Sequence, residues 1–148
     1  MFVVVDSSVW SLALRRRKGV LSPSERVLVD ELGNLIDEGR VKLLGLVRHE
    51  LLCGIREHSH YESLRMYLRG FPDVPIDTAD YELAATISNS CRSVGIASST
   101  VDSLICAVAS ARNWTVFTTD DDFKQYLRVQ PLGLHIPHDA GNNPGRMP

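Results

Sequence analysis

The chain opens with a stretch that strongly constrains its fold: residues 2–10 read Phe-Val-Val-Val-Asp-Ser-Ser-Val-Trp. Three consecutive valines predict a short strand that is buried on both faces, as in a parallel sheet. Because an unpaired buried carboxylate costs several kcal/mol, Asp6 must lie where the strand emerges, and ligands of open α/β sheets bind beyond that end. The alternative is that Asp6 only caps the next helix, with Ser7 and Ser8 sharing that role.

The remaining chain alternates strand and helix patterns, which predicts one α/β domain with a parallel sheet. With 148 residues and 44% hydrophobic content, the chain is long enough for a single core. We expect this domain to span 1–138 and a loose tail to follow at 139–148. The predicted helices lie near 11–18, 22–39, 47–55, 77–95 and 98–109, and the strands at 41–46, 114–118 and 132–136. The segment 71–76 is expected to be an edge strand or a connection.

The net charge, the apolar runs and the cysteines of the chain limit the classes of protein to which it can belong. The formal net charge of −2 gives no global sign of a nucleic-acid binder. No apolar run is long enough to cross a bilayer and no signal peptide is recognisable, so we expect a cytoplasmic protein without membrane contact. Cys53, Cys91 and Cys106 lie far apart in apolar stretches, which favours buried reduced thiols over disulfides or a zinc site.

Two other groups of residues carry less information. The basic run Arg15-Arg16-Arg17-Lys18 suits a helix end, although it could also grip a phosphate backbone or an acidic partner, and its role stays open. The four histidines that come in near pairs are interpreted as solvated surface or tail residues and not as metal ligands: His58, His60, His135 and His138.

Four carboxylates occupy equivalent places in the predicted fold. Asp6 and Asp120 follow strands, whereas Glu50 and Asp102 are expected in the first turns of helices that follow the strand layer. Each has a simpler explanation as a cap, a dipole partner or a solvated acidic turn. Strand ends and the helix starts after them share one edge of a parallel sheet, however, so the four side chains are expected to converge.

Converging carboxylates cannot all stay ionised without compensation, so protons or divalent cations must share the site. A ligand set of oxygens alone selects Mg²⁺, or Mn²⁺, over zinc. Such a site polarises a phosphodiester and activates a water for in-line attack, so we expect hydrolysis of a nucleic-acid backbone. Ser7, Thr118 and Thr119 are candidate supporting residues, with capping as the competing role for Ser7.

Four short motifs surround the candidate carboxylates, in this order along the chain: Val-Val-Asp-Ser-Ser-Val-Trp (4–10), His-Glu-Leu-Leu-Cys-Gly (49–54), Val-Asp-Ser-Leu-Ile-Cys-Ala (101–107, after Gly95-Ile96) and Phe-Thr-Thr-Asp-Asp-Asp-Phe (117–123). With these motifs the chain resembles the PIN-domain family, and more narrowly the VapC-type toxins of toxin–antitoxin modules. The resemblance spans residues 2–136.

This resemblance implies a three-layer α/β/α fold with a mostly parallel sheet and a magnesium-dependent endoribonuclease that cleaves RNA. It also implies a homodimer and a VapB-type antitoxin as partner. The implied metal ligands are Asp6, Glu50, Asp102 and Asp120, with Asp122 as a further candidate. The alternatives are a cellular PIN-domain nuclease without an antitoxin, an inactive PIN-like binding module, and, in another class, a magnesium-binding phosphoacceptor signalling domain.

Overall fold

The computed structural model describes residues 1–16 and 18–138. Arg17 and the predicted tail at 139–148 lie outside the described residues, as does the side chain of Lys18. In chain order the elements are β1 (Val3–Val5), α1 (Ser7–Leu14), the 3₁₀ turn η1 (Lys18–Val20), α2 (Pro23–Asp37), β2 (Val41–Lys42), α3 (Gly45–Leu52), α4 (His58–Leu68), α5 (Thr78–Ser93), α6 (Thr100–Arg112), β3 (Thr115–Phe117), α7 (Asp122–Tyr126) and β4 (Gly133–Leu134).

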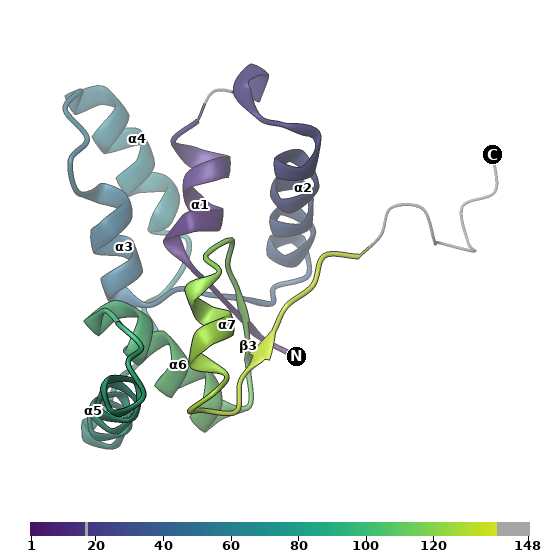
Figure 1. Cartoon of the computed structure of the whole chain (residues 1–148). Coiled ribbons are helices and arrows are strands. Elements are labelled where there is room, and N and C mark those ends of the chain that lie inside the picture. Colours follow the sequence, from purple (N-terminus) through teal and green to yellow (C-terminus); the bar gives the residue numbers. More distant parts are fainter. Residues whose placement is uncertain (17, 139–148) are drawn as a thin grey trace.

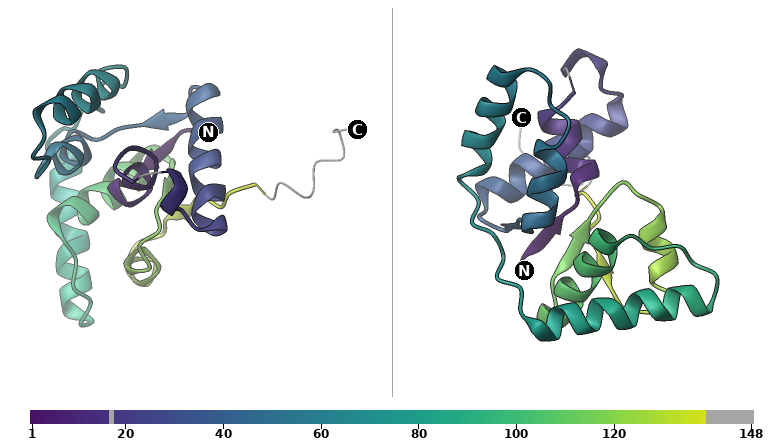
Figure 2. Two further views of the ribbon diagram at one scale, coloured as in Figure 1. Left: turned by 90° about the horizontal axis from the view of Figure 1, so that it is seen from above. Right: turned by 90° about the vertical axis from the view of Figure 1, so that its left-hand side faces the viewer.

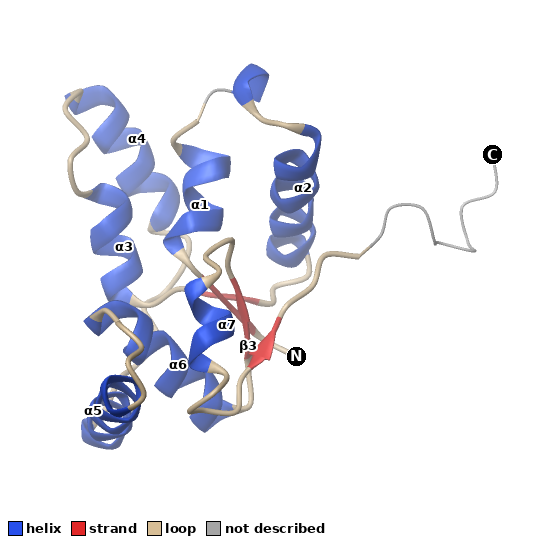
Figure 3. Cartoon of the chain, viewed as in Figure 1, coloured by secondary structure: helices blue, strands red, loops and turns tan. Residues whose placement is uncertain are grey.

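The four strands form one sheet in the order β2-β1-β3-β4, and every neighbouring pair is parallel. Figure 1 shows α1, α2, α3 and α4 on one side of the strands and α5, α6 and α7 on the other. A perpendicular view in Figure 2 shows the same division, and Figure 3 shows the strands between the two groups of helices. The predicted α/β/α architecture with a parallel central sheet is therefore confirmed.

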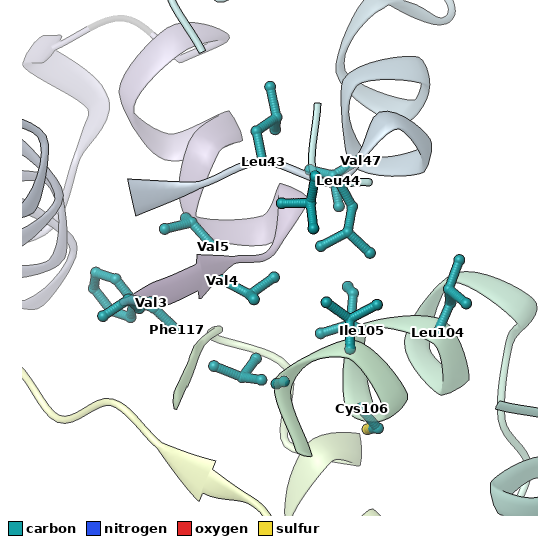
Figure 4. Packing of buried hydrophobic residues seen from close by; sticks show 14 of the residues in the cluster. Val3, Val4, Val5, Leu43, Leu44, Val47, Leu104, Ile105, Cys106 and Phe117 are labelled. Carbon is teal, nitrogen blue, oxygen red and sulfur yellow. The ribbon is translucent and has the colours of Figure 1, made fainter. Parts of the chain in front are cut away.

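The core lies between the sheet and the two helical layers. Val3, Val4 and Val5 have no exposed surface, as expected for a central strand covered on both faces. Figure 4 shows the side chain of Val4 on the side of β1 that faces Ile105 of α6, and the side chains of Val3 and Val5 on the opposite side. Burying a side chain of this size contributes about 1.5–3 kcal/mol, so the short strand is held mainly by its helical layers.

Helix boundaries follow the expected capping signals. Ser22 and Glu25 form a reciprocal capping box at the start of α2, and Asp77 and Asp80 form another at the start of α5. Gly39 follows the end of α2 with a φ of 68°, a conformation that glycine adopts without strain.

Several predicted boundaries were wrong. The strand expected at 41–46 ends at Lys42. Leu43 and Leu44 are buried, but they form the connection in which the chain turns into α3. α3 begins at Gly45, so Glu50 lies in its second turn and not in its first. α4 and α7 were not predicted. The segment 71–76 is a connection, one of the two forms expected for it, and contains an isolated bridge between Asp73 and Leu43.

Predictions for individual side chains met different outcomes. Arg16 pairs with Glu25 at 2.7 Å, which fits an exposed helix end. Cys91 and Cys106 are buried free thiols as expected, and burial raises the pKa of Cys106 to about 12. Cys53 is exposed, which contradicts its predicted burial, because it lies at the C-terminal end of α3.

None of the helices in the described ranges combines the length and apolarity needed to cross a bilayer.

Candidate active site

Asp6 lies directly after β1 and is 6% exposed. It occupies the N-cap position of α1 but makes no side-chain capping bond. Instead, its Oδ2 accepts hydrogen bonds from the hydroxyls of Ser8, at 2.7 Å, and Thr118, at 2.9 Å. The carboxylate is therefore oriented by hydroxyl groups from two strand ends, which the capping interpretation does not explain.

The loop after β3 is tied to the same carboxylate. Thr118 Oγ1 accepts a hydrogen bond from the backbone N–H of Asp120 at 3.0 Å, and Ser8 Oγ accepts one from the N–H of Thr119 at 3.1 Å. The hydroxyls of Ser8 and Thr118 lie 3.3 Å apart. Because Thr118 binds both Asp6 and the backbone of Asp120, the ends of β1 and β3 form one connected network.

Glu50 reaches this edge from α3. The hydroxyl of Ser7 donates to Glu50 Oε2 at 3.1 Å, and Ser7 is the neighbour of Asp6 in the chain. Ser7 thus holds a second carboxylate and makes no cap. The side chain of Glu50 is partly exposed, in contrast to that of Asp6.

Asp102 approaches from the first turn of α6 and is partly buried. Its Oδ2 accepts a 2.7 Å hydrogen bond from the phenol of Tyr126, a buried residue at the end of α7. Its backbone N–H donates to Ser99 Oγ, so Ser99 and not Asp102 caps α6. The carboxylate of Asp102 is consequently left to face the sheet edge.

The electrostatics show that the carboxylates lie close enough to interact. Burial raises the pKa of Asp102 above its usual range, and the charges of Asp6 and Asp120 raise it further, against a lowering by the bond from Tyr126. Burial, the bond to Asp102 and the neighbouring charges of Asp122 and Asp120 raise the pKa of Tyr126. The sheet edge is therefore a region of mutual carboxylate repulsion.

The three aspartates of the acidic run after β3 differ in their contacts. Asp120 is exposed, and its Oδ1 accepts from the N–H of Asp122 at 2.9 Å. Asp121 is 87% exposed and pairs with Lys124 at 3.0 Å, so it does not join the network. Asp122 is exposed in the first turn of α7, which makes it a peripheral member of the set.

The donor set suits a hard divalent cation. All four principal candidates offer carboxylate oxygens, with hydroxyls beside them and no imidazole or thiol bonded to them in this network. Within residues 1–16 and 18–138, no three His, Cys, Asp or Glu side chains are grouped tightly enough to hold a metal as they stand. Among the described residues the carboxylates are therefore linked through hydroxyl groups and do not form a closed ligand cage.

Sequence reasoning missed two residues of this site. Ser8 was considered only as a helix cap, yet it bonds Asp6 and the loop after β3. Tyr126 carried no sequence signal at all, because its contact with Asp102 depends on how α7 packs against α6.

The PIN domain family model matches residues 3–128, which is most of the chain. The chain therefore belongs to the PIN domain family. This assignment decides against the phosphoacceptor signalling domain. No match was found among curated proteins.

Solved structures share the fold. FitAcB from Neisseria gonorrhoeae superposes with a TM-score of 0.72 at 21% identity, covering 92% of this chain and 98% of that chain. VapBC2 from Rickettsia felis, solved with a DNA fragment from its promoter, gives 0.70 at 18% identity, covering 91% and 98%. VapBC-5 from Mycobacterium tuberculosis, described as a member of the VapBC family of toxin–antitoxin systems, gives 0.63 at 18%, covering 90% and 98%.

Proposed function

We propose that this protein is a Mg²⁺-dependent endoribonuclease and the toxin of a toxin–antitoxin pair. The observation that carries the proposal is the network at the carboxyl edge of the parallel sheet, where hydroxyl groups bond Asp6 and Glu50 and the charges of Asp6 and Asp120 act on Asp102, in a chain of the PIN domain family. The substrate inferred is RNA, whose phosphodiester backbone is the group that such an edge can act on once a cation offsets its charge.

The same four carboxylates would hold the ion, with Asp122 as an outer candidate. Bound Mg²⁺, or Mn²⁺, supplies a Lewis acid for a phosphodiester and lowers the pKa of water. The residues around the carboxylates contribute to the chemistry by holding them in position. Ser8 and Thr118 fix the Asp6 carboxylate, Ser7 holds Glu50, and Tyr126 holds Asp102. Placing reacting groups in this way can replace a large part of an activation barrier.

The sharpest test is Asp6→Asn, which keeps the size of the side chain and removes its charge. Cleavage of a mixed single-stranded RNA in Mg²⁺ should fall by about 100-fold or more, a loss in the range measured when a metal site is damaged. Asp30→Asn is the matched control, because Asp30 is an exposed carboxylate on α2 that lies outside this network. Undiminished cleavage by Asp6→Asn would exclude the mechanism.

A second readout does not depend on turnover. Mg²⁺ should raise the unfolding temperature of the native protein, since a cation relieves the repulsion that raises the pKa of Asp102 and binds only the folded state. The rise should disappear in the variant Asp6→Asn and persist in Asp30→Asn. Equal rises in all three proteins would show that the ion binds elsewhere.

The antitoxin part of the proposal is supported by two solved structures of similar fold, a toxin–antitoxin complex from Klebsiella pneumoniae and a member of the VapBC family of toxin–antitoxin systems from Mycobacterium tuberculosis. We infer a homodimer that binds a small VapB-type antitoxin. Overexpression should arrest growth, and co-expression of a short neighbouring open reading frame should restore it. If RNA is cleaved but growth is unaffected, the alternative of a cellular PIN-domain nuclease without an antitoxin is correct.

A further inference from the structure

A hollow of about 200 Å³ adjoins the carboxylate edge between β4 and α7. Val116 and Leu134, which pair across β3 and β4, form its apolar floor, and Ile136 forms a wall. Thr118 and Asp120 line this hollow and also belong to the carboxylate network. The hollow, which we call the β4–α7 hollow, is therefore continuous with the candidate active site.

Ile136 is the most unusual part of this lining. It is 80% exposed, which is high for a large apolar residue outside any strand or helix. The histidines near it on both sides are nevertheless anchored to α2 by their side chains. Glu31, which is 4% exposed, has its Oε1 at 2.7 Å from His135 Nε2 and at 3.1 Å from His138 Nδ1. Ile136 is thus held in place while its side chain stays open to a ligand.

The charge at the opening suits a phosphate chain. Lys124 lines the hollow from α7 and pairs only with the exposed Asp121 among the salt bridges of the described residues, at 3.0 Å. Both side chains are largely exposed, at 70% and 87%, and exposed pairs of this kind contribute little. The ammonium of Lys124 is therefore available to exchange its partner for a phosphate oxygen.

We propose that the β4–α7 hollow receives one nucleobase of single-stranded RNA, the base that adjoins the phosphodiester at the carboxylate edge. This inference rests on the proposed function and adds a subsite to it. The hollow is smaller than the about 300–1,000 Å³ of pockets for drug-sized ligands, so it suits one flat ring. Single-stranded RNA presents unstacked bases, and a base that enters a protein pocket packs between aromatic or apolar side chains.

The test measures coupling between the base and Ile136. Fluorescence anisotropy gives the Kd of a short single-stranded RNA in Mg²⁺, and of a set of the same RNA with one abasic ribose at each position. A Glu50→Gln background is used so that no cleavage occurs. At one position, removing the base should weaken binding about tenfold, as loss of one stacked base does.

In the variant Ile136→Ala the same base removal should change Kd by less than about threefold, because the contact is already lost. Val20→Ala is the matched control, since Val20 is a similarly exposed apolar residue, at 68%, in η1. It should keep the full tenfold effect. Both substitutions affect exposed side chains, so the fold should be retained.

The outcomes separate the two proposals. If the native protein cleaves RNA but base removal has the same effect with and without Ile136, the subsite is excluded and the nuclease stands. If no RNA is bound or cleaved, both proposals fail. If Ile136→Ala leaves the base effect unchanged and weakens only the complex with the product of the neighbouring frame, the hollow serves a protein partner and the inference is overturned.

Discussion

The phenol of Tyr126 donates a 2.7 Å hydrogen bond to Oδ2 of Asp102, across the contact between α7 and α6. Tyr126 is 1% exposed, so its hydroxyl is committed to this acceptor. The bond favours the ionised form of Asp102, against the burial and the charges of Asp6 and Asp120 that raise its pKa. Tyr126 is accordingly a positioning residue that helps to keep Asp102 ready for a cation.

Replacing Tyr126 by Phe keeps the ring and its edge-to-face contact with Phe123 while it removes the hydroxyl. The pKa of Asp102 should then rise further, and protons should compete better with Mg²⁺. We expect the Mg²⁺ concentration for half-maximal RNA cleavage to increase about 3–10-fold at pH 5.5, on the scale of one hydrogen bond to a charged group, and to increase less at pH 8. A Mg²⁺ titration at both pH values checks this.

The contrary result is equally clear. If Tyr126→Phe lowers cleavage by the same factor at both pH values and leaves the Mg²⁺ midpoint unchanged, the hydroxyl acts on structure and not on the ionisation of Asp102. A parallel urea unfolding curve for the variant identifies that case, because a structural role would appear as a lower midpoint.

The two serines after Asp6 give a matched pair of variants. Ser8→Ala removes the 2.7 Å bond to Asp6 and the acceptor for the N–H of Thr119, whereas Ser7→Ala removes only the bond to Glu50. We expect kcat to fall about 10–100-fold for Ser8→Ala, the range for partners that orient metal ligands, and less for Ser7→Ala. Single-turnover cleavage at saturating Mg²⁺ measures the difference. An equal or reversed ranking would show that the Ser8 network does not orient Asp6.

Much of this site could be predicted because topology sets it. The valine run of 3–5 identifies a buried strand, and a carboxylate at its end must emerge at the ligand edge of the sheet. The same reasoning applies to Asp120 after β3, and helix capping signals place Asp102 at the start of α6. Such positions depend on backbone direction alone, which hydrophobic patterns encode.

Contacts between side chains could not be predicted in this way. Ser8 looks like a capping residue in the sequence, and only the meeting of β1 with β3 makes its hydroxyl a partner of Asp6. Glu50 was predicted in the first turn of its helix but lies in the second. The error arose because Leu43 and Leu44 match a strand pattern, although they belong to the buried connection before α3. Boundaries of short strands are set by tertiary contacts, which periodicity does not report.

His135 is a further case. It was interpreted as a tail residue, but its side chain is 9% exposed and pairs with buried Glu31. Burial alone would raise the pKa of Glu31, yet hydrogen bonds from His135 and His138 outweigh that effect and lower it. The partners are more than one hundred residues apart in the chain, and no local pattern announces such a pairing.

This pairing gives a stability prediction. His135→Ala should destabilise the fold by about 1–3 kcal/mol, because it leaves the buried Glu31 carboxylate with a lost hydrogen bond. His138→Ala should cost about 1 kcal/mol or less, because His138 is 78% exposed and water can replace its ring. Urea unfolding at pH 7 compares the two. A larger loss for His138→Ala would mean that the two histidines do not share Glu31 as described.

The ion pair between buried Asp80 and partly exposed Arg112 predicts how the protein responds to acid. Asp80 is 5% exposed and accepts from both terminal nitrogens of Arg112, at 2.8 and 2.9 Å. The guanidinium of Arg112 lowers the pKa of Asp80 to about 2 from an ordinary value of 3.8. This shift corresponds to about 2 kcal/mol of stability.

The lowered pKa of Asp80 determines that its stabilising contribution is lost as the pH falls. Because the pKa of Asp80 is lower in the folded than in the unfolded state, the contribution of Asp80 to the free energy of unfolding is complete above about pH 4. It is lost as the pH falls from about 4 towards 2. Asp80→Asn removes the titrating group, so the variant should be less stable than the native protein at pH 6 by about 2 kcal/mol, and the gap should close towards pH 2. Urea unfolding at pH 6, 4 and 2.5 measures it; a gap that stays constant would show that Asp80 does not account for this part of the acid sensitivity.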